Sequence, residues 1–290
     1  MPYLLRHTVL PLVAVLAITG CNATSAPIEK SSSATETRYE MVLKSEVNWE
    51  HLNPARGDKS PSAGTLWGDR NGRQATGYLL KPTDGFSSPP HIHNVSYRGV
   101  VISGLIHNDD PDAAKMWMPA GSFWTQPKGE VHVTAAKGDN TLAYIEIEEG
   151  PYLVWPAIQA FDNGERPVNV DQSNIVWLDG STINWLPHND SENKLEIAYL
   201  WGEPNGDQHY GALIKLPAGF NGKLVSEGES LRAIVIKGQP EYQSPDQQQS
   251  NNLTPGSYFG ADGSSEHKIS SNSTTETILY LRTNKMLRIE

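Results

Sequence analysis

Cysteine is almost absent from this chain. Its 290 residues include a single cysteine, Cys21, so the chain cannot form an internal disulfide or a cluster of thiolates around a metal ion. Positive charge is also scarce, with 23 Lys and Arg against 33 Asp and Glu and a formal net charge of −10. Nucleic-acid binding requires clustered Lys and Arg, and the sequence has no such cluster. We therefore expect no nucleic-acid partner.

Long apolar segments are missing as well. The N-terminal run from Val9 to Ile18 follows Arg6 and is interrupted by Pro11, whereas a membrane span needs about 20 apolar residues. A short run of this kind is typical of a secretory signal. Its end, Ile-Thr-Gly followed by Cys21, resembles the lipobox of bacterial lipoproteins, in which the chain is cut before the cysteine and the thiol is acylated. The resemblance implies a signal peptide over residues 1–20 and lipidation of Cys21.

An acylated Cys21 would attach the protein to a membrane through lipid alone. Asn22 stands where an aspartate tends to retain lipoproteins at the inner membrane, so we expect a lipoprotein of the cell envelope, on the periplasmic face of the outer membrane. The following segment is rich in Ser, Thr and Ala, and we predict a flexible tether over residues 21–44. Because the only thiol is used by the lipid, chemistry must rely on histidine, carboxylates, hydroxyls or a metal.

The remainder of the chain is an internal duplication. Residues 66–86 align without a gap to residues 200–220, with 11 of 21 positions identical, and such a repeat indicates two copies of one structural unit. Further matches include Arg98 with Arg232 and His132 with His267. We predict domains at 45–160 and 172–290, with the connection at 156–172.

Sustained helical periodicity is absent from both copies. Short alternating or β-branched runs occur instead, such as 76–80, 142–147 and 277–281, separated by clusters of Gly, Pro, Asn and Asp. This spacing predicts an all-β fold, with a sandwich or small barrel in each copy.

Three histidines of the first copy stand in two spaced motifs. Gly85 is followed by His91 and His93 and then Gly104, and a second run reads Gly121-x5-Pro127-x-Gly129-x2-His132. These runs resemble the two motifs of the cupin superfamily, G-x5-H-x-H-x3-4-E-x6-G and G-x5-P-x-G-x2-H, with the glutamate missing. The wider sequence, from NWEHLNPARG to EEGPYLV, resembles an uncharacterised family of bacterial double-cupin lipoproteins with ChrR-like domains. The resemblance implies two tandem RmlC-like jelly-roll barrels, a bicupin.

The spacing of the histidines has a physical reason. Alternate residues of a strand project to one face, so His91 and His93 point together, and His132 from a neighbouring strand can complete a set of three. Imidazole nitrogens suit Fe, Zn, Mn or Ni, and three protein ligands leave positions open. We predict one divalent ion held by these three histidines, with a full 2+ charge because no carboxylate accompanies it.

Several side chains near the motifs are candidates for catalysis. Tyr97 and Arg98 stand where the cupin glutamate would fall. Tyr97 has the strand parity of the ligands and could be a general acid or hydrogen-bond donor, or a tyrosine that merely lines the barrel. Arg98 could dock a substrate carboxylate, but the retained Arg232 favours a structural salt bridge. Glu130 could be a displaced ligand or base, or an exposed turn residue.

Gln126 and Trp124 could line the mouth of the first barrel and contact substrate, although buried aromatics are commonly core. In the second copy, Val225 and Glu227 replace the two-histidine pair, which predicts a degenerate barrel with only Glu227 and His267 as possible ligands.

The leading hypothesis is a metal-dependent enzyme, of dioxygenase or lyase type, that acts on a small molecule in the envelope. The alternative is a non-catalytic module that binds or senses a metal or small ligand. Exposed strand edges leave a homodimer open.

Overall fold

The computed structural model describes residues 37–186, 194–204, 206–247, 249–272 and 274–290. The predicted signal peptide, Cys21 and most of the predicted tether lie outside the described residues. No helix within the described ranges combines the length and the apolarity needed to cross a bilayer.

Regular structure in the described ranges is almost entirely β-strand, as the sequence predicted. The strands of the first half are β1 (Arg38–Val42), β2 (Glu50–His51), β3 (Ser62–Trp67), β4 (Thr76–Lys81), β5 (His91–His93), β6 (Tyr97–Asp109), β7 (Phe123–Gln126), β8 (Val133–Ile147), β9 (Val154–Pro156) and β10 (Val168–Val170). Those of the second half are β11 (Leu178–Asp179), β12 (Glu196–Trp201), β13 (Tyr210–Leu216), β14 (Asn221–Ser226), β15 (Ser230–Lys237), β16 (Glu241–Gln243), β17 (Asn251–Asn252), β18 (Tyr258–Asp262), β19 (Ser265–Ser270), β20 (Thr277–Thr283) and β21 (Leu287–Ile289). Four 3-10 helices complete the list: η1 (Lys44–Glu46), η2 (Pro54–Lys59), η3 (Ala157–Gln159) and η4 (Gln172–Asn174).

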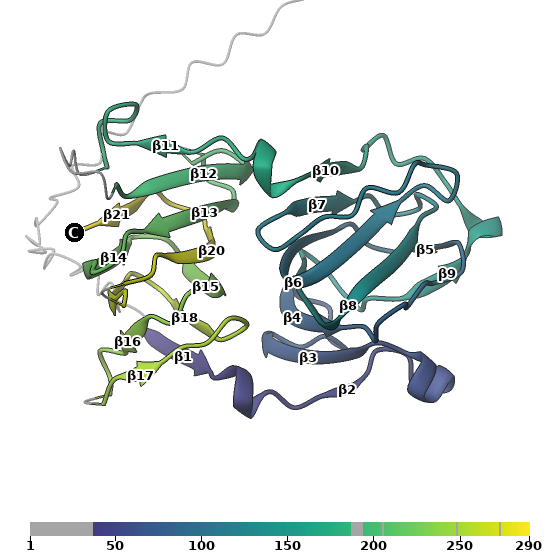
Figure 1. The fold of residues 1–290 in the computed structure, drawn as a ribbon, viewed down its shortest axis with the longest axis horizontal. Helices are drawn as coiled ribbons and strands as arrows, with labels where there is room; N and C mark the ends of the chain where they lie inside the picture. The colour runs from purple at the N-terminus through teal and green to yellow at the C-terminus, as the bar shows by residue number, and fades with distance from the viewer. Residues whose placement is uncertain (1–36, 187–193, 205, 248, 273) are drawn as a thin grey trace, which may run out of the picture. The chain divides into compact units, whose positions relative to one another are not determined.

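The strands form two barrels with the same order (Figure 1). One seven-stranded antiparallel sheet runs β10-β7-β6-β8-β4-β3-β2, and its counterpart runs β1-β18-β15-β20-β13-β12-β11. The second barrel is closed by the five-stranded sheet β17-β16-β19-β14-β21. The first barrel has an equivalent second layer, which contains the pair β5-β9 and the parts of the long strands β6 and β8 that extend into it.

The bend of β6 depends on one glycine. The pairing of β6 with β8 shifts register on both sides of Ser103, and Gly104 follows with a φ of 72°. A Cβ at Gly104 would lie 2.2 Å from the Thr141 hydroxyl oxygen. Only glycine combines the positive φ with that close approach, so this glycine of the first motif lets one strand serve both layers.

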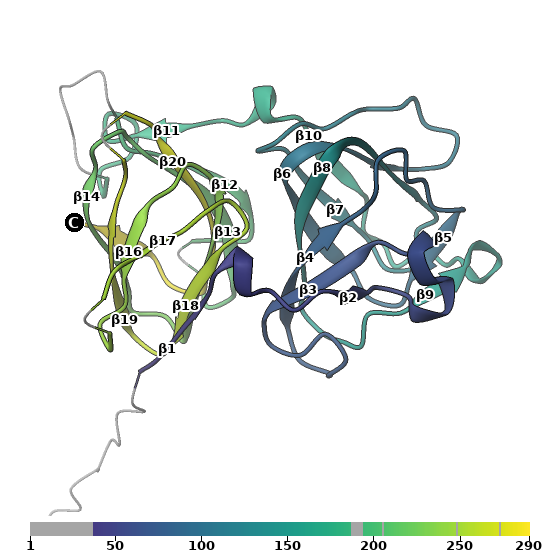
Figure 2. The ribbon, with the colours of Figure 1, turned by 60° about the horizontal axis from the view of Figure 1, so that its bottom comes forward.

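The two barrels exchange their outermost strands. Strand β1 precedes the first barrel in sequence but pairs with β18 of the second, over all five of its residues. Strand β10, which leads into the second barrel, pairs with β7 of the first. Figure 2 shows β1 lying along β18. Residues 38–42 therefore do not belong to a tether as predicted, and the first barrel's sheet extends beyond residue 160, because each of these segments completes the hydrogen bonding of a sheet edge.

Buried apolar side chains form three clusters. One fills the first barrel, around Tyr78, Val101 and Ile145, and another fills the second barrel, around Ile214 and Phe259. The third joins side chains of both seven-stranded sheets, so it forms the interface between the barrels. The barrels belong to one compact unit.

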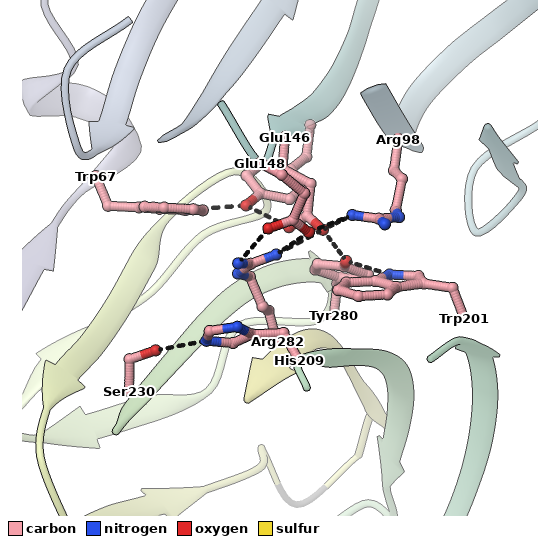
Figure 3. Close-up of polar contacts among 10 residues, drawn as sticks. Trp67, Arg98, Glu146, Glu148, Trp201, His209, Ser230, Tyr280 and Arg282 are labelled. Atoms are coloured by element: carbon pink, nitrogen blue, oxygen red, sulfur yellow. Dashed lines mark hydrogen bonds and ion pairs between the residues drawn. The ribbon is translucent and has the colours of Figure 1, made fainter. Parts of the chain in front are cut away.

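A polar network with pseudo-two-fold symmetry lies within that interface (Figure 3). The indole N–H of Trp67 donates to the Tyr144 hydroxyl, and that of Trp201 donates to the Tyr280 hydroxyl, at 2.9 Å in each barrel. Both tyrosines in turn donate to Glu146, at 3.0 and 2.7 Å. Glu146 is only 1% exposed, so this carboxylate of the first barrel binds one hydroxyl from each barrel.

Two arginines complete the network. Arg282 of the second barrel forms a two-pronged ion pair with Glu148 of the first, at 2.7 and 2.8 Å. Arg98 reaches Glu148 at 2.6 Å and stacks over the Trp201 ring at 3.6 Å from its centroid. Burial alone would raise the pKa of the Glu148 carboxyl, but Arg282 and Arg98 outweigh it and lower that pKa to about 2.

We expect acid to weaken the interface through Glu148. Its folded-state pKa lies below the ordinary 4.5, so its stabilising effect is present above pH 4.5 and is lost as pH falls toward 2. The melting temperature should therefore fall less steeply over this window in Glu148→Gln than in the parent. Glu266→Gln, which removes a carboxylate paired with Lys223 outside the interface, should keep the parent's slope. Equal slopes for parent and Glu148→Gln in calorimetry would refute this account.

Candidate metal centre

The backbone brings the three predicted ligands together. His91 and His93 lie on β5, whose partner is β9. His132 precedes β8 and faces His91 across an isolated bridge, with backbone hydrogen bonds of 3.2 and 3.0 Å between the two residues. His93 and His132 are 2% and 1% exposed, whereas His91 is partly exposed. The ligand atoms of the three rings lie within 4.8 Å of one another.

Each imidazole is fixed by a backbone carbonyl. The Nδ1 atoms lie 2.9 Å from the Pro89 oxygen for His91, 3.0 Å from the Leu153 oxygen for His93 and 3.2 Å from the Glu130 oxygen for His132. A carbonyl can only accept, so each neutral ring carries its proton on Nδ1 and leaves Nε2 as a bare lone pair. Such outer contacts are those that orient histidines around metals.

The three rings fit a metal ion better than a proton. The Nε2 atoms of His91 and His93 are 3.1 Å apart, and two lone pairs at that distance repel unless a cation lies between them. Burial, above all, lowers the pKa of all three rings, that of His132 to about 3, so a proton is disfavoured. Metal–nitrogen distances of about 2.0–2.1 Å place neighbouring ligands roughly 3 Å apart, which the His91–His93 pair matches at 3.1 Å, while the whole set lies within 4.8 Å.

Tyr97 points into the same site, as its strand parity predicted. Its hydroxyl lies 3.4 Å from His132 Nε2 and donates to Asn108 Oδ1 at 2.9 Å. Asn108 Nδ2 then donates to Gln126 Oε1 at 2.8 Å. Burial raises the pKa of the Tyr97 hydroxyl, so the phenol stays neutral and supplies no anionic oxygen.

Tyr152 is a site residue that sequence reasoning missed. Its ring stacks on His93, with centroids 4.2 Å apart and planes 22° apart, and its hydroxyl donates to His93 Nε2 at 2.9 Å. It follows β8 in a loop and has no strand parity that could have placed it. Its place within the EEGPYLV run was the only available signal.

Arg98 is not part of this site. It alternates with Tyr97 along β6 and therefore faces the barrel interface, where it pairs with Glu148. This contact supports the structural salt bridge rather than a substrate contact, because alternation along β6 places Arg98 on the face opposite Tyr97.

Glu130 contributes its backbone rather than its carboxylate. Its carbonyl accepts from His132 Nδ1 and from Gln126 Nε2. The only cluster of possible metal ligands among the described residues consists of the three histidines, without a carboxylate. The idea of Glu130 as a fourth ligand is therefore not supported by the geometry.

A cavity of about 90 Å³ opens beside the histidines. Trp124 lines it and is 1% exposed. Gln126 does not line it. Its amide holds Asn108 in place, so Gln126 is a supporting residue rather than the predicted substrate contact.

In the second barrel, Leu224 and Ser226 stand at the ligand positions, not the predicted Val225 and Glu227. His267 pairs with Leu224 across β19 and β14, as the third ligand pairs with the first in the other barrel. The second barrel has one residue fewer between Asn221 and Leu224 than the first has between Ser87 and His91, because the offset between the copies falls from 134 to 133 within this segment. A shift of one residue exchanges the two faces of a strand.

The remaining candidates of the second barrel are engaged elsewhere. The His267 ring lies between the Tyr242 hydroxyl, at 3.0 Å from Nδ1, and the Ser265 hydroxyl, at 3.1 Å from Nε2. Glu227 pairs with Arg288 at the surface. No metal-ligand cluster occurs in the described part of this barrel.

Comparison with known proteins supports the fold. A family model described as a domain of unknown function (DUF4437) matches residues 40–290, and no curated protein matches the chain. A proposed dioxygenase of Nostoc punctiforme is similar with a TM-score of 0.61 and 13% identity, over 86% of this chain and 83% of that chain. Protein Ylba of E. coli gives 0.57 and 12%, over 85% and 91%. The 7S globulin of Momordica charantia gives 0.52 and 10%, over 86% and 84%. At these identities the likeness shows the fold alone, which is the bicupin fold.

We expect Gln126→Leu to act on stability and leave metal content unchanged. The substitution strands the Asn108 amide in a buried position, which costs about 1–3 kcal/mol and lowers the melting temperature by roughly 2–10 °C. Gln159→Leu, at an exposed position in η3, is the matched control and should melt like the parent. Loss of metal with an unchanged melting temperature would contradict the supporting role.

Proposed function

We propose that this chain, which belongs to the DUF4437 family, is a metal-dependent cupin enzyme that acts on a small molecule. One observation carries the proposal: three Nε2 atoms converge beside a cavity while their Nδ1 atoms are held by backbone carbonyls. His91, His93 and His132 would hold one divalent ion, of Fe, Zn, Mn or Ni, and leave coordination positions open toward the cavity.

The surrounding residues suit a role in catalysis. A bound divalent ion would supply Lewis acidity and, if it is iron, oxygen chemistry of the dioxygenase type. An ion bound to His93 Nε2 would take that lone pair from the Tyr152 hydroxyl, and the hydroxyl could then donate to a substrate atom beside His93. The Tyr97 hydroxyl donates its hydrogen bond to Asn108, so it can only accept a hydrogen bond from a group in the site. Trp124 and the apolar wall limit access of water to the site.

The alternative proposal is a module that binds or senses a metal or a small ligand. It is favoured by the absence of a carboxylate from the described histidine cluster, because Tyr97 and Tyr152 are weak bases. Oxygen uptake distinguishes the two: turnover of small diketones, thiols or phenols supports the enzyme, and tight binding without turnover supports the sensor.

Metal analysis tests both proposals. The purified protein should contain about one equivalent of divalent metal, and His91→Ala/His93→Ala should contain almost none, because one histidine cannot hold the ion. His267→Ala is the matched control, since it removes the equivalent of His132 from the second barrel, and it should keep the metal. Absence of metal from the parent, even after reloading, would retire the metal-dependent function.

We further propose that the protein acts as a lipoprotein of the cell envelope, facing the periplasm. The support is the Ile-Thr-Gly-Cys21 sequence after a short apolar run. Cys21→Ser should abolish acylation and shift the protein from the membrane to the soluble fraction, or stall its processing, as followed by fractionation and mass spectrometry. Unchanged membrane retention in this variant would exclude the lipid anchor.

A further inference from the structure

The cavity beside the histidines has an apolar wall and no acidic residue among the described residues that line it. The apolar part comes from Leu52, Pro61, Leu80, Phe86, Ile145 and Val154. Apart from the histidines, its charged lining residue is Arg56. With a divalent ion on the three rings, every formal charge around this space would be positive.

Arg56 is presented by a braced loop. It lies in η2, between β2 and β3, and Asn53 caps this helix by accepting from the Ala55 N–H at 3.1 Å. The C-terminal end of η2 is fixed to its start because the Asn53 N–H donates to the Ser60 hydroxyl at 2.8 Å. Both ends of η2 are therefore fixed, so the backbone at Arg56 is held beside the cavity while its side chain is exposed.

Arg56 forms no ion pair with a described residue, although its neighbourhood contains acids. Asp58 lies in the same helix but its carboxylate is near His51, at 3.8 Å. Most other arginines of the described chain are paired with carboxylates: Arg38, Arg70, Arg98, Arg166, Arg232, Arg282 and Arg288. An unpaired guanidinium at an apolar cavity is suited to a ligand's carboxylate, which it can bind through two parallel hydrogen bonds.

We propose that the cavity takes a small monocarboxylate, with the carboxylate on Arg56 and a short apolar body against the cavity wall, toward the histidines. The inference rests on the proposed function, because the same cavity leads to the metal site. The cavity of about 90 Å³ suits a body of a few carbons, since an engineered cavity of about 150 Å³ holds benzene. A second negative charge would find no further described cation in the lining besides the metal site.

The test compares an acid with its neutral counterpart. Butyrate and butyramide have nearly the same shape, and calorimetric titration of the metal-loaded full chain should give butyrate an affinity about tenfold higher or more. Arg56→Gln should remove this difference without changing metal content, and Arg56→Lys should keep part of it. Affinity for butyrate should fall with added salt, because Arg56 is exposed enough to be screened.

Lys59→Gln is the matched control, since it removes a positive charge from the same helix at a position outside the cavity lining. It should bind butyrate as the parent does. The inference is overturned if butyrate and butyramide bind alike, if Arg56→Gln retains the preference, or if Lys59→Gln loses it equally.

Titration of the metal-stripped chain separates this inference from the proposed function. If the protein never takes up metal, the proposed function fails, and an Arg56-dependent preference for butyrate in the stripped chain still supports the anion site. If metal binds normally but the preference does not depend on Arg56, the carboxylate inference fails alone.

Discussion

The buried carboxylate of Glu146 is the contact on which the two-barrel arrangement depends. A carboxylate without partners in an apolar interface would carry a large desolvation penalty. Glu146 offsets this penalty by accepting a hydrogen bond from one tyrosine hydroxyl of each barrel. Its carboxylate also lies 3.7 Å from Arg98 and 3.8 Å from Arg282. Its partners come from both copies, so neither barrel could satisfy this group alone.

The duplication also explains why this interface had to become asymmetric. Glu146 lies opposite Gly77 in the first sheet, and Arg282 lies opposite Gly211 in the second, so the two occupy equivalent places. Identical charges at these places would face each other across the pseudo-two-fold axis and repel. One acid and one base, by contrast, attract. The same division appears inside the barrels, where one keeps three histidines and the other packs Leu224 and Ser226 at the first two ligand positions.

The sequence alone was sufficient to predict the features that depend on the alternation of side chains along a strand. The all-β class, the duplication, the convergence of His91, His93 and His132, and the inward orientation of Tyr97 all follow from periodicity and spacing. Alternation also separated Tyr97 from Arg98, although the partner of Arg98 lies 50 residues away and could not be identified. Tyr152 and Arg56 were not found because they reach the cavity from loops, where no period relates sequence to direction.

Other failures have a topological origin. The tether prediction is wrong over β1 because its partner, β18, lies some 220 residues further along the chain, and the alternation of its own residues is too short to predict a strand. The prediction misplaced the ligand positions of the second barrel by one residue, because the segment that forms β14 lost a residue without leaving a trace in the flanking identities. Both errors concern long-range register, which a single sequence does not encode locally.

The exchanged edge strands have a consequence for the order of assembly. Strand β1 is the first described strand to be synthesised, yet its partner β18 is among the last strands to leave the ribosome. The first barrel can gather its own strands early and needs only β10 to finish its sheet, whereas the second cannot be completed until the beginning of the chain returns to it. Such distant pairing slows folding. If the chain were cut between the barrels, the pairing of β1 with β18 and of β10 with β7 would still hold the barrels together.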